Sequence, residues 1–81
     1  MENVYLLIGN NLKTLRLKCK LTQDKLAGAL HISPCYYRRV EKGNVNPSVN
    51  YLLLFSNFYN VSLRELVSNL ESDPAGERQT T

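Results

Sequence analysis

Apolar side chains recur along residues 3–20 at intervals of four, four and three positions. They are Val4, Ile8, Leu12 and Leu15. Such intervals bring side chains to one face of a helix, and Asn3 is a suitable N-cap at its start. The pattern therefore predicts a first helix over this stretch, in which Gly9 costs about 1 kcal/mol relative to alanine.

A second helix is predicted over residues 23–30, because Thr22 is a suitable N-cap residue. The side chains that we expect inward are Leu26, Ala27 and Leu30. Ala27 is small, and the neighbouring Gly28 and Ala29 are small too. Helices that cross at a steep angle need small residues where they touch, so we expect a close helix–helix approach here.

A third helix follows a short turn at His31 and Ile32. Ser33 is its predicted N-cap, Pro34 fits the first helical position, and Gly43 supplies a left-handed C-cap. At 100° per residue, one side of this helix carries Tyr37, Val40 and Glu41, the other side carries Cys35, Arg39 and Lys42, and the flanks carry Arg38 and Tyr36.

A fourth helix is predicted from the N-cap Ser48 to about Tyr59, where Asn60 can adopt the left-handed conformation that ends a helix. The residues that we expect inward are Val49, Leu52, Leu53, Phe55, Ser56 and Tyr59. Leu54 and Phe58 make the apolar stripe wider than one core face requires.

A fifth helix is predicted from the capping box of Ser62 and Glu65 to about Leu70. Its expected inward residues are Leu63, Leu66 and Val67. Residues 71–81 show no apolar periodicity, so we expect a disordered polar tail there. The chain is thus predicted to hold one compact all-α five-helix domain over residues 1–70.

Positive charge is concentrated in the first half of the chain. Residues 1–43 hold eight Lys and Arg against three Asp and Glu, whereas residues 44–81 hold two against four. A concentrated positive surface attracts phosphates through Coulomb energy and counterion release. Composition alone leaves a solvated charged surface as the alternative.

Several classes of function are not expected. Cys19 and Cys35 are too few for a secreted disulfide framework and have no Cys or His neighbour at ligand spacing, so we expect free thiols in a reducing cytoplasm and no metal site. No apolar run reaches the roughly 18 residues of a membrane span. Because no nucleophile–base pair or phosphate-binding loop is evident, we expect no enzyme, cofactor or small-molecule substrate.

Short motifs spread from Ile8 to Leu66 resemble those of the Cro/cI-type, or XRE-like, helix-turn-helix domain. The matching residues are Ile8-Gly9, Leu12, Arg16, Leu21-Thr22-Gln23, Leu26-Ala27, Ile32-Ser33, Val40-Glu41-Lys42-Gly43, Asn46-Pro47-Ser48 and Val61-Ser62-Leu63. The resemblance implies a lambda-repressor-like bundle of five helices. Its second and third helices would form the DNA-binding motif, with the recognition helix over residues 33–42 in the major groove.

The resemblance also implies roles for single residues. It gives a phosphate contact to Gln23, base-reading positions to Pro34, Cys35 and Arg39, backbone contacts to Tyr36 and Asn44, and a buried ion pair to Arg16 and Glu41. The residue types add that Arg38 and Arg39 can bind guanine O6 and N7, and that Lys42 suits a phosphate. Backbone N–H groups at the helix start beside Ser33 can bind phosphate as well.

Four positions depart from the family pattern. His31 stands in the turn where the family usually has glycine, which implies backbone strain. Pro34 and Cys35 cannot make bidentate amide contacts with bases, so base discrimination moves towards Arg38 and Arg39. Tyr37 replaces an aliphatic core residue, and its hydroxyl needs a hydrogen-bond partner if it is buried.

These observations predict a sequence-specific regulator of transcription that binds double-stranded DNA. We expect a homodimer on a palindromic operator, with Leu54 and Phe58 in the dimer interface. Two alternatives stay open. One is a restriction–modification controller or an antitoxin-type regulator with a protein partner, and the other is a protein-interaction module of the same fold that does not bind DNA.

Overall fold

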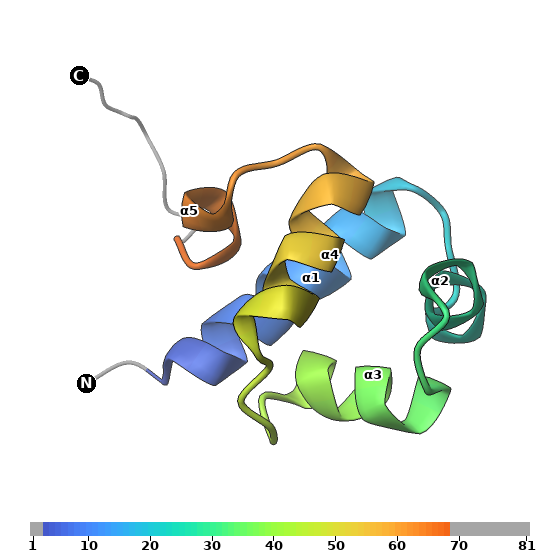
Figure 1. The fold of residues 1–81 in the computed structure, drawn as a ribbon, viewed down its shortest axis with the longest axis horizontal. Helices are drawn as coiled ribbons and strands as arrows, with labels where there is room; N and C mark the ends of the chain where they lie inside the picture. The colour runs from blue at the N-terminus through green and yellow to red at the C-terminus, as the bar shows by residue number, and fades with distance from the viewer. Residues whose placement is uncertain (1–2, 69–81) are drawn as a thin grey trace.

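The computed structural model describes residues 3–68, which form five helices and contain no strand (Figure 1). The helices are α1 (Val4–Lys18), α2 (Gln23–Leu30), α3 (Pro34–Lys42), α4 (Val49–Tyr59) and α5 (Leu63–Leu66). This architecture confirms the all-α prediction. No helix within this part of the chain is long and apolar enough to cross a membrane, and the predicted tail over residues 71–81 lies outside it.

The helices surround one small core. In Figure 1, α4 lies in front of α1 at the centre, α2 and α3 lie to the right and below, and α5 lies at the left. The buried apolar side chains are Ile8, Leu12, Leu26, Ala27, Tyr37, Val40, Phe55 and Leu66. Every helix contributes at least one of them, so α3 is held by the same core as the other four.

A side-chain oxygen caps the start of every helix in residues 3–68, as the sequence predicts. The N-caps are Asn3, Thr22, Ser33, Ser48 and Ser62. Three helices end on a left-handed residue, at His31 (φ 59°), Gly43 (φ 77°) and Asn60 (φ 56°). These termini follow from local hydrogen bonding, which is why the sequence locates them correctly.

Gly28 is not at a close helix–helix approach, although the sequence suggests one there. A Cβ added at Gly28 would meet nothing within 4 Å, although Ala27 beside it is fully buried. A Cβ added at Gly9 would instead collide with the backbone carbonyls of Glu41 and Val40, the latter at 2.6 Å. Gly9 therefore lets α1 lie directly against the backbone of α3.

Several apolar residues predicted inward are exposed. They are Val4, Val49, Leu53, Leu63 and Val67, with exposed fractions between 37% and 63%. Because α1 and α4 are apolar on more than one side, periodicity does not identify which side of them meets the core. The last helix is also shorter than expected, because α5 ends at Leu66 with Val67 as its C-cap.

Candidate nucleic-acid interface

The turn between α2 and α3 sets the position of the third helix. His31 adopts φ 59° and ψ 41°, so the position expected to be strained does take the left-handed conformation. The backbone N–H of Ile32 donates to the carbonyl of Ala27 at 3.0 Å, and that of His31 donates to Gly28 at 3.2 Å. These bonds close the end of α2 and fix the direction in which Ser33 starts α3.

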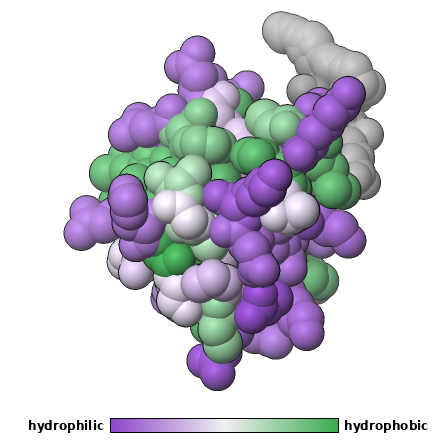
Figure 2. Space-filling view, turned by 90° about the vertical axis from the view of Figure 1, so that its right-hand side faces the viewer, coloured by the Kyte–Doolittle hydropathy of each residue, from purple (hydrophilic) through white to green (hydrophobic). Residues whose placement is uncertain are grey.

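The outer face of α3 carries exposed polar and basic side chains. Cys35, Arg39 and Lys42 are exposed, as are Ser33 and Pro34 at the start of the helix. The view from the side of α2 shows hydrophilic residues over much of the lower part of the molecule, with hydrophobic residues gathered in a band above (Figure 2). The side of α3 that is predicted to face outward is therefore the side that is exposed.

The two flanks of α3 face different neighbours. On one flank, Arg38 Nη1 donates to Oδ1 of Asp24 in α2 at 3.0 Å. On the other, the ring of Tyr36 lies 4.8 Å from that of Tyr51 in α4, and burial raises the pKa of the Tyr36 hydroxyl. Tyr36 is thus half-buried against α4. Only part of its side chain is exposed for the predicted contact with the DNA backbone.

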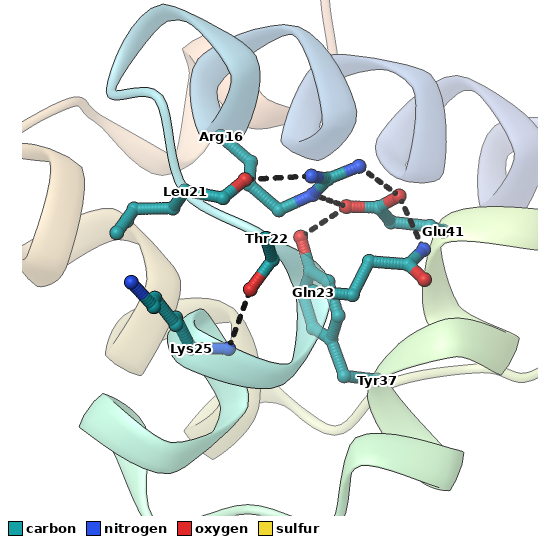
Figure 3. A network of polar contacts seen from close by, with 7 residues as sticks. All are labelled: Arg16, Leu21, Thr22, Gln23, Lys25, Tyr37 and Glu41. Atoms are coloured by element: carbon teal, nitrogen blue, oxygen red, sulfur yellow. Dashed lines mark hydrogen bonds and ion pairs between the residues drawn. The ribbon is translucent and has the colours of Figure 1, made fainter.

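The inner face of α3 is anchored by the carboxylate of Glu41 (Figure 3). Arg16 donates to it from Nε at 2.7 Å and from Nη2 at 3.2 Å. Gln23 Nε2 donates to Oε1 at 2.9 Å, and the hydroxyl of Tyr37 donates to Oε2. Arg16 Nη1 also donates to the carbonyl of Leu21 at 2.8 Å, so one cluster joins α1, α2, α3 and the loop between α1 and α2.

Hydrogen bonding outweighs burial in setting the charge state of this cluster. Burial alone raises the pKa of Glu41, but the hydrogen bonds from Arg16, Tyr37 and Gln23 together hold that pKa below its ordinary value. The bond to Glu41 raises the pKa of Arg16 against the opposing effect of burial. Burial, followed by the bond to Glu41, raises the pKa of Tyr37. The carboxylate and guanidinium therefore stay charged at neutral pH.

The predicted ion pair of Arg16 and Glu41 is present, but the sequence reasoning missed two of its partners. Gln23 was expected to contact phosphate, and its amide instead donates to Glu41, which leaves one N–H of the same amide for another acceptor. Tyr37 lies one helical turn before Glu41, and this i, i+4 spacing is the signal that identifies its partner.

The remaining predicted residues lie at the edges of this surface or away from it. Asn44 is exposed just after α3, and its backbone N–H donates to the carbonyl of Arg39 at 3.0 Å. Leu54 is half-buried in α4, whereas Phe58 is 41% exposed and its ring lies edge-on to Tyr59 at 5.0 Å. Both residues lie on α4 and so are separate from the exposed surface of α3.

Comparison with known proteins matches the chain to regulators. A sequence model of the helix-turn-helix family matches residues 12–66, which include all of α2 to α5. Control protein C.MunI from a Mycoplasma species is 32% identical over 74 residues, which are 90% of this chain and 100% of that protein. The HTH-type transcriptional regulator y4dJ of Sinorhizobium fredii is 33% identical over 72 residues, which are 89% and 94% of the two chains.

A solved structure is similar over most of its length. The crystal structure of the restriction-modification controller protein C.AhdI from Aeromonas hydrophila has a TM-score of 0.70 and 29% sequence identity to this chain. The similarity covers 76% of this chain and 94% of C.AhdI.

Proposed function

Because this chain belongs to the Cro/cI-like helix-turn-helix family of DNA-binding transcription regulators, we propose that it reads an operator with α3 in the major groove. Membership confirms the resemblance drawn from the sequence. The observation that supports the proposed groove contact is the division of α3, whose inner face is buried and hydrogen-bonded while Arg39 and Lys42 are exposed on its outer face.

Each exposed residue has a role that suits its chemistry. Arg39 carries a planar guanidinium that can donate two hydrogen bonds to guanine, which suits base reading. Lys42 in the last turn suits a phosphate, because an ammonium group is a point charge without directional preference. Backbone N–H groups beside Ser33 and the free N–H of Gln23 offer further phosphate contacts.

The proposed active form is a homodimer. Phe58 is an exposed aromatic residue on α4, and Leu54 lies one helical turn before it. Exposed apolar residues of this size in a small domain suit a contact with a second copy, and a two-fold dimer places two recognition helices about 34 Å apart. The operator is then expected to be a palindrome.

Selection of bound duplexes from a random pool tests the proposal. We expect a palindromic consensus that contains guanines, and we expect Arg39→Ala to lose one of these preferences and about tenfold or more in operator affinity. Lys42→Ala should instead weaken binding to all sequences alike and reduce its salt dependence. Full affinity and unchanged base preference in Arg39→Ala would exclude Arg39 as a reading residue, and the same result in Arg38→Ala as well would exclude α3 as the reading helix.

A narrower role is supported by two of the named relatives. C.MunI is named a control protein and C.AhdI a restriction-modification controller. Regulation of a restriction–modification operon is therefore a second candidate, and neighbouring genes for a methyltransferase and an endonuclease test it. The relatives are regulators and controllers, so they do not favour an interaction module that does not bind DNA.

A further inference from the structure

Asp24 places a negative charge beside the recognition helix. Its carboxylate lies in the first turn of α2 with 74% of the side chain exposed, and Oδ1 accepts a hydrogen bond from Arg38 Nη1 at 3.0 Å. An exposed pair of this kind adds little to folding stability. Asp24 also opposes phosphate binding at a helix start that otherwise favours anions. The carboxylate is favoured in the first turn of α2 by the helix dipole, but stability does not account for its contact with Arg38.

The geometry of the pair leaves Arg38 able to bind a base. The contact uses a single terminal nitrogen, and among residues 3–68 the Arg38 side chain makes no other hydrogen bond. The Nε–Nη2 edge is thus open, and two adjacent N–H groups are what a bidentate contact with guanine O6 and N7 requires. Asp24 restricts the rotation of the guanidinium without occupying that edge.

Arg38 and Arg39 differ in this respect. Within the part of the chain that the structure describes, Arg39 has no side-chain hydrogen bond or ion pair, whereas Arg38 is held from a second helix. A side chain already held in one orientation loses less conformational entropy when it binds. The two neighbouring arginines therefore differ in how strongly they are preorganised.

We propose that Asp24 is a positioning residue for base recognition, which orients Arg38 towards a guanine and repels phosphate where no guanine is present. This inference rests on the proposed function and extends it. It makes a residue of α2 partly responsible for the ratio between the affinity for the operator and the affinity for random DNA. Loss of the carboxylate then increases binding to random DNA and decreases discrimination at the base that Arg38 reads.

The test compares four new variants of the full chain, together with Arg39→Ala, on the selected operator, on operators with one guanine replaced, and on a random duplex. Arg38→Ala identifies the guanine, because preference at that base falls about tenfold or more. Asp24→Asn should lower the same preference about two- to fivefold while it tightens binding to the random duplex. In the Arg38→Ala background, Asp24→Asn should leave base preference unchanged.

Glu65→Gln is the matched control, because it removes an equal charge from α5 and glutamine can keep the capping box with Ser62. It should leave base preference as in the natural chain. Thermal unfolding confirms that each variant is folded.

The outcomes separate this inference from the proposed function. If Asp24→Asn changes operator and random binding by the same factor, as Glu65→Gln does, Asp24 is only a surface charge and the inference is wrong. If Arg38→Ala loses no base preference while Arg39→Ala does, the inference is wrong and the proposed function stands. A pool that yields no enriched sequence overturns both.

Discussion

Glu41 orients α3 through one carboxylate. It accepts hydrogen bonds from Arg16 in α1, Gln23 in α2 and Tyr37 in α3. A buried ion pair adds little net stability because both charges lose their hydration, but its geometry is specific. The additional donors satisfy the carboxylate oxygens, so the cluster fixes how α3 is rotated relative to α1 and α2.

Removal of the Tyr37 hydroxyl tests this cluster without emptying the core. Tyr37→Phe keeps the buried ring but removes one donor to a charged acceptor, so the free energy of unfolding should fall by about 1.5–3 kcal/mol at pH 7. Urea unfolding measures this change. Tyr5→Phe, on an exposed tyrosine, should leave the free energy of unfolding unchanged.

The same variant gives a pH dependence with a defined sign. The pKa of Glu41 is held below its ordinary value of 4.5, so its contribution to stability is complete above that pH and is lost as the pH falls through the lower folded-state pKa. Tyr37→Phe moves that pKa back towards 4.5. The stability difference between variant and natural chain should therefore be smaller at about pH 3 than at pH 7. A constant difference would contradict the role of Tyr37 as a donor to the carboxylate.

At the residue scale, the sequence predicts what depends on near neighbours. The cap at Ser33 and the left-handed end at Gly43 follow from hydrogen bonds within a few residues. The pair of Arg16 and Glu41 was accessible only through the family pattern. The bond from Gln23 to the same carboxylate joins two helices, so no local pattern indicates it.

At the scale of elements, the contact of α1 with α3 depends on two glycines. Gly9 lies against the carbonyls at the end of α3, and a Cβ at Gly43 would lie 2.7 Å from Cα of Leu6. The sequence shows Gly9 as a cost to α1 and as part of the family pattern Ile8-Gly9. It does not show the reason for the glycine, because helix propensity is local and the approach of two backbones is not. The requirement for glycine is visible only once the helices are packed.

Two glycine-to-alanine variants should change stability in opposite directions. Gly9→Ala places a methyl group against backbone that cannot move aside, so we expect a loss of about 2–3 kcal/mol despite the better helix propensity of alanine. Gly28→Ala enters open space in α2 and should gain up to about 1 kcal/mol. Chemical denaturation measures both. A stable Gly9→Ala would mean that α1 and α3 lie further apart.

Asn11 attaches α5 to α1. Its buried Nδ2 donates to the carbonyl of Leu66 at 2.8 Å and to that of Ser68, at the end of the short last helix. Asn11→Ala should cost about 1–3 kcal/mol and speed hydrogen exchange at the amides of Leu66 and Val67. Asn10→Ala is the control, since Asn10 is exposed in the same helix. Equal exchange in the two variants would contradict the attachment.

At the scale of the whole molecule, basic and apolar surfaces lie on different helices. The exposed Arg39 and Lys42 lie on α3, whereas Leu53 and Phe58 are each 41% exposed on α4. The sequence predicted more apolar residues on α4 than one core face requires and named Leu54 and Phe58 as the surplus. Phe58 is exposed, but the other exposed apolar residue of this pair of turns is Leu53 and not Leu54. Tertiary packing decides which of them are exposed, as the error at Leu53 shows.

Phe58→Lys tests whether the α4 surface joins two copies. A buried lysine without a partner is costly, so the dimer dissociation constant should rise about tenfold or more while the monomer stays folded. Sedimentation equilibrium measures the association, and circular dichroism measures the fold. Leu17→Lys changes an exposed apolar residue on α1 and should leave association intact. The reverse result would place the interface on α1.

The division of α3 into an anchored and an exposed side has a consequence for divergence and design. The contacts that hold this nine-residue helix against the core are made by Tyr37, Val40 and Glu41, so these positions tolerate little change. Within residues 3–68, no such contact is made by the side chains of Cys35, Arg39 and Lys42. They can therefore be substituted without loss of the fold. If α3 reads the operator as we propose, a chain with this scaffold acquires a new operator by substitution at the exposed base-reading positions of α3 while the anchored side is kept.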